Sequence, residues 1–187
     1  MVQKNNYLEF APDFEKTITH TSFDNLVEAT YKGEDISTME RFYRWVAGMY
    51  MARAEPATGF GPGNFYNFYR SYTVTSFRTY VSDNPEKSGI HSYYLMTLVE
   101  QGFPGLLFFI LLCFFVLIKG EVIYHQTKDP TRRKNIMTIL MSMVAIYALL
   151  LINDMIETDK VGTFFFMNMA LLVNMDLANK EEKKEIA

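Results

Sequence analysis

The sequence of 187 residues is poor in the side chains that most metal and nucleophilic sites use, with one cysteine, Cys113, and three histidines. One thiol cannot form an intrachain disulfide or a cysteine-based metal site, and inside an apolar run it most often packs as a small hydrophobic group. His20 and His125 stand outside any catalytic or metal-binding motif. The sequence therefore indicates neither a zinc site nor a serine-hydrolase triad.

Excess positive charge is also lacking. The formal net charge is −3 at pH 7, which argues against binding to nucleic acid. The mean hydropathy of −0.01 resembles that of a soluble protein, but it averages two unlike halves. About the first 100 residues are polar and aromatic, whereas the rest holds three apolar runs without charge.

The apolar runs cover residues 103–118, 136–152 and 161–175. A membrane-spanning helix needs about 20 apolar residues, which the second run nearly supplies alone and the first reaches if its helix continues. The third is shorter and contains Asn168 and Asn174. The first run is apolar on all sides, unlike a helix on a soluble domain. We therefore predict a mainly α fold, a polytopic membrane protein fragment whose external helical loop region, residues 1–102, precedes two to three transmembrane helices at about 103–123, 136–152 and 161–175.

The charges between the runs predict an orientation. The first connection carries five basic residues, whereas the second, "NDMIETDK" at 153–160, carries three acidic residues and one lysine. The positive-inside rule places the first connection and the C-terminal tail in the cytoplasm. Residues 1–102 then face outward.

Residues 1–30 contain no apolar segment of a signal peptide. A polar region of this size reaches the outside only behind an upstream membrane segment. We therefore expect the chain to be the C-terminal part of a larger polytopic protein and to be inactive alone. The inverted orientation conflicts with the five-base connection.

An amphipathic helix is predicted over 37–55. "STME" at 37–40 has the form of a capping box, and Pro56 follows the last turn. Arg41 and Arg44 lie three residues apart and so are neighbours on the helix. They are either a solvated pair or an anion clamp, because guanidinium groups near a helix N-terminus match phosphate oxygens. The apolar face is predicted from helical spacing to consist of Met39, Phe42, Trp45, Val46, Met49 and Tyr50.

"GFGPGNF" at 59–65 has alternating glycines but lacks the spacing of the dinucleotide fingerprint. A tight turn that needs the backbone freedom of glycine is favoured over a phosphate cradle. The aromatic segment that follows contains Arg70 and Arg78. Its rings are typical of a membrane interface, although aromatic faces also suit sugars.

"HSYYLMTLVEQGFPGLL" leads from His91 into the first apolar run. Imidazole suits proton transfer near neutral pH, and Glu100 lies about two and a half helical turns further on, where it could form a local hydrogen bond. From the residues alone, His91 is as readily an interfacial helix cap as a catalytic group.

In their order, "RFYRW" at 41–45, the glycine turn and the run from His91 resemble the C-terminal part of the O-antigen ligase and O-antigen polymerase superfamily, over about residues 37–120. Ser92 stands where the common family form has asparagine. Members of this superfamily also have many more membrane helices than this chain supplies.

The resemblance implies a glycosyltransferase of lipopolysaccharide and other surface polysaccharide synthesis, located in the bacterial inner membrane with residues 1–102 in the periplasm. The implied donor is an undecaprenyl-diphosphate-linked glycan, and the acceptor is lipid A-core in ligases or another lipid-linked glycan in polymerases. No metal or cofactor is implied. The family's loop arginine and histidine correspond to Arg41 and His91, the predicted catalytic residues. Arg44 has no counterpart in the family and is added for its proximity to Arg41 on the helix; with Tyr93 and Glu100 it is predicted to bind substrate.

The residues are also compatible with a second hypothesis about function. The chain could be a non-catalytic, membrane-anchored module whose aromatic loop binds a glycan or a partner protein.

Overall fold

The architecture is that of a computed structural model, which describes residues 36–73 and 89–186. Every regular element in these ranges is a helix, so the predicted mainly α class is confirmed. The elements are α2 (Ile36–Ala54), α3 (Phe65–Tyr72), α5 (Tyr93–Gln126), α6 (Pro130–Ile152), the short 3₁₀ helix η2 (Met155–Glu157) and α7 (Asp159–Ile186).

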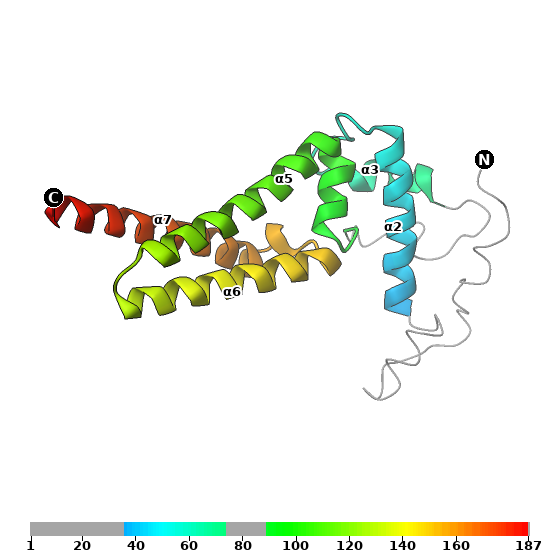
Figure 1. Ribbon diagram of the computed structural model, residues 1–187. Coiled ribbons are helices and arrows are strands. Elements are labelled where there is room, and N and C mark those ends of the chain that lie inside the picture. The colour runs from blue at the N-terminus through cyan, green and yellow to red at the C-terminus, as the bar shows by residue number, and fades with distance from the viewer. Residues whose placement is uncertain (1–35, 74–88, 187) are drawn as a thin grey trace, which may run out of the picture.

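Three of these helices are long and apolar enough to cross a membrane, over Tyr93–Gln126, Pro130–Ile152 and Lys160–Glu182. They run side by side and reverse direction at each connection (Figure 1). Large apolar side chains such as Phe108 and Met141 point outward, as lipid-facing residues do. The chain is therefore a polytopic membrane protein, and the third apolar run is one of its candidate spans.

Each of these helices is longer than its apolar run. The side chain of Ser92 accepts a hydrogen bond from the Leu95 amide at the start of α5. Asp129 accepts from the amides of Thr131 and Arg132 at the start of α6, where Pro130 occupies the first turn. The first turns of α5 and α6 are polar because they are capped. A prediction from hydropathy alone therefore places the start of each helix too far along the chain.

The core of the bundle lies between α5, α6 and α7. Cys113 is buried there beside Met143 and Phe165, as expected for a packed thiol. Asn168 of α7 donates to the hydroxyl of Ser142 on α6 across 2.9 Å. This hydrogen bond explains how a polar residue is accommodated within the third apolar run, since interhelical hydrogen bonds stabilise helix pairs in membranes.

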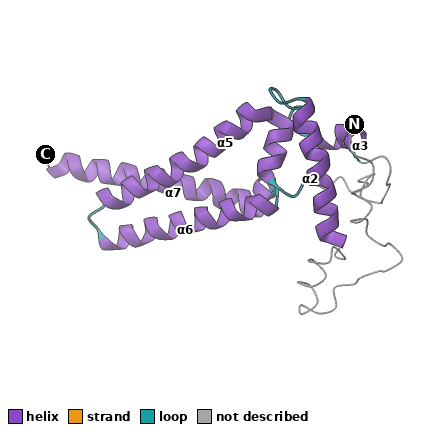
Figure 2. Cartoon of the chain, turned by 45° about the vertical axis from the view of Figure 1, so that its right-hand side comes forward, coloured by secondary structure: helices purple, strands orange, loops and turns teal. Residues whose placement is uncertain are grey.

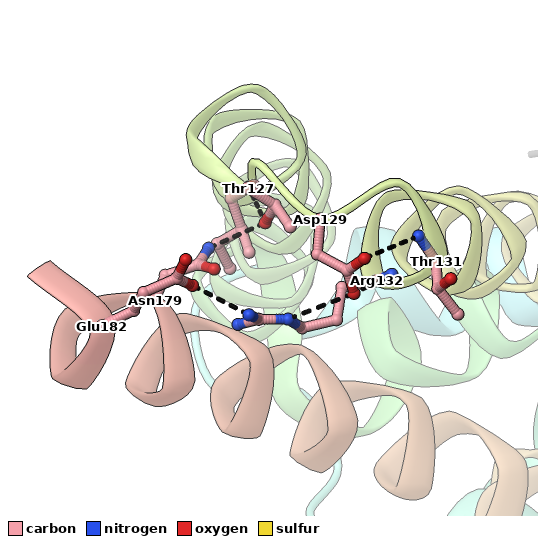
Figure 3. A network of polar contacts seen from close by, with 7 residues as sticks. Thr127, Asp129, Thr131, Arg132, Asn179 and Glu182 are labelled. Atoms are coloured by element: carbon pink, nitrogen blue, oxygen red, sulfur yellow. Dashed lines mark hydrogen bonds and ion pairs between the residues drawn. The ribbon is translucent and has the colours of Figure 1, made fainter.

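A polar network closes one end of the bundle (Figure 3). Asn179 of α7 donates to Thr127 Oγ1 across 2.8 Å. Arg132 pairs with Glu182 at 2.8 Å and with Asp129 at 3.4 Å. These contacts tie α7 to the α5–α6 connection and the start of α6, where Lys128, Arg132, Arg133 and Lys134 lie. Helix α2 lies at the opposite end of the bundle (Figure 1).

Helix α5 is broken at Gly102, whose φ of 68° and ψ of −171° are not helical. Its first part, residues 93–101, therefore points in a different direction from the apolar part, 103–126. Figures 1 and 2 show the first part beside α2, with both crossing the long direction of α6 and α7. This geometry suits two helices that lie along the membrane surface.

The predicted apolar face of α2 is only partly correct, since Trp45 packs against the helical core while two other members face outward. Phe42 and Met49 are exposed, whereas Arg44, Ala47 and Met51 are buried. The packed face combines the large Met51 with the small Ala47, Gly48 and Ala52. At Gly48 α2 lies close to the start of α5, because a Cβ there would collide with the side chain of Ile90. Helical spacing of large apolar residues included Phe42 and Met49, which face outward, and left out Met51, which is buried.

Two features predicted from the sequence concern residues that the structure does not describe. The capping interaction of Ser37 and Glu40 involves such side chains, although the described part of α2 begins at Ile36. Arg78 and the end of the aromatic segment also lie outside the described residues.

Candidate functional site

A hydrogen bond between α2 and the start of α5 forms the centre of the candidate site. Nη1 of Arg44 lies 2.7 Å from Nε2 of His91, and the same nitrogen donates to the Gly89 carbonyl at 3.3 Å. The Arg44 residue is only 4% exposed. Because a guanidinium can only donate, Nε2 of His91 must accept, and the imidazole is neutral with its proton on Nδ1.

The backbone of His91 is strained. Its φ of 56° makes it a non-glycine residue in the left-handed region, among those that the structure describes, at a cost of about 1–2 kcal/mol. The neighbouring chain holds it there: Ile90 is fully buried, and the Tyr93 amide donates to the Asn153 carbonyl at 3.2 Å. Strain maintained by its surroundings is common at functional sites.

The electrostatic environment favours the neutral form of His91. Partial burial lowers the pKa of the imidazole below its usual 6.5, and the charges of Arg44 and Arg41 lower it further. Asp154 opposes them by raising the pKa. At neutral pH the ring is therefore a proton acceptor, the form that general-base chemistry needs.

Asp154 is a site residue that the sequence did not single out. It precedes η2, and a Cβ on Gly89 would collide with its carboxylate, so the loop beside His91 packs directly against it. In the sequence it was only one of three acidic residues in the α6–α7 connection. The order of the helices could have indicated its position. Because α5 and α6 are antiparallel, the α6–α7 connection lies at the end of the bundle where α5 begins.

Acidic and hydroxyl-bearing side chains interact electrostatically with Asp154. The pKa of the Tyr66 phenol is raised by burial and then by Asp154, Glu100 and Glu157. The pKa of the Glu157 carboxyl is raised by burial and by Glu100 and Asp154. The negative charges of Glu100, Asp154 and Glu157 therefore oppose the positive charge of Arg44 at this end of the bundle.

The glycine turn forms a clamp on the broken helix. The amides of Phe60 and Gly61 donate to the carbonyls of Val99 and Glu100, at 2.9 and 2.8 Å, and the Phe103 amide donates to the Pro56 carbonyl at 2.8 Å. Ends of helices leave such backbone groups without partners, and burial without hydrogen bonds would be costly. The turn therefore stabilises the break, which agrees with its interpretation as a tight turn.

Glycine is required where the two segments meet. Gly59 and Gly102 both have positive φ. A Cβ on Gly59 would collide with the backbone at Glu100, and a Cβ on Gly102 would lie 2.7 Å from the carbonyl oxygens of Pro56 and Ala57. Neither position can hold a side chain without moving the clamp.

Glu100 and Tyr93 have structural partners. Glu100 is 7% exposed, and its Oε1 accepts from the Phe65 amide at 3.3 Å. A carboxylate at this first turn of α3 is favoured by the helix dipole. The ring of Tyr93 packs edge-on against Phe109, with 5.0 Å between centroids.

The structure therefore brings part of the predicted set together. His91 and Arg44 are in direct contact, and Arg41 lies near enough to influence the imidazole. Glu100 contacts the backbone of α3, while Tyr93 packs within the helices. The direct partner of His91 is thus the arginine that the resemblance did not assign.

Fold and site together define a polytopic membrane protein with an arginine–histidine centre at one end of its helices. The family model described as O-antigen ligase matches residues 10–110, and the chain belongs to this family. No curated protein and no solved structure matches the chain. The family comprises membrane glycosyltransferases of the ligase or polymerase type, which act on lipid-linked glycans. The match includes Arg41, Arg44 and His91, whereas Asp154 lies beyond it.

Proposed function

We propose that the protein transfers a glycan from undecaprenyl diphosphate to a hydroxyl group of an acceptor glycan, at the periplasmic face of the inner membrane. In this reaction the acceptor oxygen bonds to the anomeric carbon of the donor. The bond from that carbon to the diphosphate breaks, and the acceptor proton passes to a base. The single observation that carries the proposal is the hydrogen bond between Arg44 and His91, because it joins a diphosphate-binding group to a proton acceptor.

Arg44 and Arg41 are assigned to the diphosphate. Both are on α2, one helical turn apart, and both lie near the imidazole. Guanidinium groups bind phosphate oxygens through paired hydrogen bonds. They also stabilise the negative charge that grows on the leaving diphosphate in the transition state.

His91 is assigned to the acceptor hydroxyl. The lone pair of Nε2 accepts the Arg44 hydrogen bond. Donor binding draws the guanidinium toward the diphosphate and releases Nε2 to accept the acceptor proton. The imidazolium that forms is stabilised by Asp154, whose charge favours the protonated ring.

The remaining groups support this arrangement. Tyr66 and Glu157 are assigned to hydrogen bonds with acceptor hydroxyls, because both side chains are exposed and both interact electrostatically with Asp154. Glu100 is assigned a positioning role through α3. The site lies at the opposite end of the bundle from the basic α5–α6 connection, and the positive-inside rule then favours the periplasmic side.

A transfer assay tests the proposal. The protein, expressed from its complete reading frame, is reconstituted in vesicles with an undecaprenyl-diphosphate-linked glycan and either lipid A-core or a second lipid-linked glycan. Elongated product with one acceptor is the expected result and identifies the reaction as ligation or polymerisation. Glycan binding without turnover of either acceptor would instead support a non-catalytic module.

Glycans from a strain lacking the gene provide an independent test of the acceptor. Loss of all long chains from lipid A-core is the result expected of a ligase. A single repeat that remains attached to lipid A-core is the result expected of a polymerase. Unchanged glycans would contradict the proposed function.

A further inference from the structure

A groove between α5 and α7 lies close to the polar network that closes one end of the bundle. It has a volume of about 220 Å³. The buried Leu172 lies at its floor, and the exposed side chains of Phe115 and Val173 form its walls. Lys119 and Asp176 also line it. The groove therefore combines an apolar surface, open to lipid, with one cation and one anion.

Both charged side chains belong to candidate membrane spans, Lys119 to Tyr93–Gln126 and Asp176 to Lys160–Glu182. Ionisable residues within spans are rare, and they are usually paired or functional. Among the residues that the structure describes, Lys119 forms no ion pair. Asp176 pairs through Oδ2 with Lys180, one turn further along α7, a kind of exposed pair that contributes little. Its Oδ1 can accept a second cation.

The two charges lie at different depths in the bundle. The hydrogen bond from Asn179 to Thr127 brings these two positions to one level (Figure 3). Helices α5 and α7 both run toward that level. Lys119 precedes Thr127 by eight residues, or about 12 Å, whereas Asp176 precedes Asn179 by three, or about 4.5 Å. The cation is therefore the deeper of the two, on a flexible stem that can extend outward.

We propose that this groove binds a phospholipid with a phosphoethanolamine headgroup. An acyl chain lies over Leu172 between α5 and α7. The Lys119 ammonium donates to the phosphate, and the ethanolamine ammonium donates to the Asp176 carboxylate. In such a lipid the phosphate is nearer the acyl chains than the ammonium group is, which is the order of Lys119 and Asp176 in the groove.

The charges of the groove favour this headgroup over two others. Phosphatidylglycerol supplies a phosphate but no cation for Asp176, whose negative charge would then oppose binding. Phosphatidylcholine supplies a quaternary ammonium, which has no hydrogen to donate to the carboxylate. The inference does not rest on the proposed function, because the groove lies toward the opposite end of the bundle from α2 and His91.

Native mass spectrometry tests the headgroup. The protein, expressed from its complete reading frame, is titrated in detergent with palmitoyl-oleoyl phosphatidylethanolamine, phosphatidylglycerol or phosphatidylcholine. We expect phosphatidylethanolamine to bind about tenfold more tightly than the other two, because only it supplies both charge-assisted hydrogen bonds. Asp176→Asn should abolish its advantage over phosphatidylglycerol, and Lys119→Gln should weaken both lipids. Lys128→Gln and Glu181→Gln make the same charge changes at exposed positions outside the groove and should alter neither affinity. Equal affinities for the three lipids, or a preference that Asp176→Asn leaves unchanged, would overturn the proposal.

A second pair of variants tests the apolar part of the groove without changing its charges. Val173→Phe fills the groove and should weaken phosphatidylethanolamine binding, whereas Val144→Phe, at an exposed position of α6 outside the groove, should not. Equal binding by the two variants would contradict the proposed position of the acyl chain. The same spectra report the oligomeric state. A lipid-free dimer that Val173→Phe dissociates would assign the groove to a second copy of the chain and overturn the proposal.

Discussion

Arg44 donates a hydrogen bond to Nε2 of His91 across 2.7 Å, from a position almost completely buried between α2 and α5. The nitrogen that we propose as the proton acceptor is therefore held by the group that we propose to bind the leaving diphosphate. Under the proposed mechanism, binding of the donor would withdraw Arg44 from Nε2 and so expose the base. An acceptor without a bound donor would meet an imidazole whose lone pair is already used.

The pKa of His91 should respond in opposite directions to the two charges beside it. Arg44→Gln removes a positive charge that disfavours the imidazolium, so the pKa should rise. Asp154→Asn removes a negative charge that favours the imidazolium, so the pKa should fall. Titration by NMR of histidine-labelled protein, with His91→Gln to assign the signal, measures both. Shifts in the same direction would contradict the arrangement.

The same pKa predicts how transfer depends on pH. Because the pKa of His91 is lowered from 6.5, the wild-type rate should remain high down to below pH 6.5 and then fall as the ring becomes protonated. In Asp154→Asn the fall should begin at a lower pH, provided that turnover remains measurable. Rates in reconstituted vesicles between pH 4.5 and 8 provide the measurement. A fall that begins above pH 7 would exclude His91 as the titrating base.

Arg41 and Arg44 should both be needed, for separable reasons. The resemblance alone ranked Arg41 first, but the structure places Arg44 in contact with His91. Lysine at either position keeps the charge and loses the bidentate fork, so both variants should raise the KM for the donor. Only Arg44→Lys should also alter the His91 signal in NMR. Full activity of both arginine-to-alanine variants would contradict the diphosphate role.

The clamp predicts different costs at two glycines of the same turn. Gly59 and Gly63 both have positive φ, but a Cβ on Gly59 collides with the backbone of α5, whereas no atom lies within 4 Å of a Cβ on Gly63. Gly63→Ala should cost about 1–2 kcal/mol, the backbone strain alone. Gly59→Ala should lower the thermal unfolding midpoint in detergent considerably more. Equal midpoints for the two variants would contradict the clamp.

Much of the fold could be predicted from hydropathy and charge. Three apolar runs correspond to three candidate spans, because a bilayer imposes length and composition on any helix that crosses it. The polar first turns at Tyr93 and Pro130 were missed, since their formation depends on caps at Ser92 and Asp129. The break at Gly102 was also missed, because it depends on hydrogen bonds from a turn more than 35 residues away.

The candidate site could be predicted only in part. Motif order selected Arg41 and His91, but it could not show that Arg44 is the residue facing the imidazole. That arrangement depends on which face of α2 packs, and this face is set by the close approach of Ala47, Gly48 and Met51 to α5, which the spacing of the large apolar residues did not predict. Asp154 reaches the site through the α6–α7 connection, a tertiary contact that no local pattern records.

The most direct measurement of the central claim is the transfer rate of His91 variants in reconstituted vesicles, with His125→Ala as the control at the opposite end of the bundle. Loss of an acid–base group should lower turnover of His91→Ala by about 100- to 10,000-fold, with donor binding little changed. His91→Gln, which cannot take up the proton, should be impaired nearly as much, whereas His125→Ala should retain wild-type turnover. Wild-type turnover in His91→Ala would contradict the account and leave His91 as a structural residue at the membrane surface.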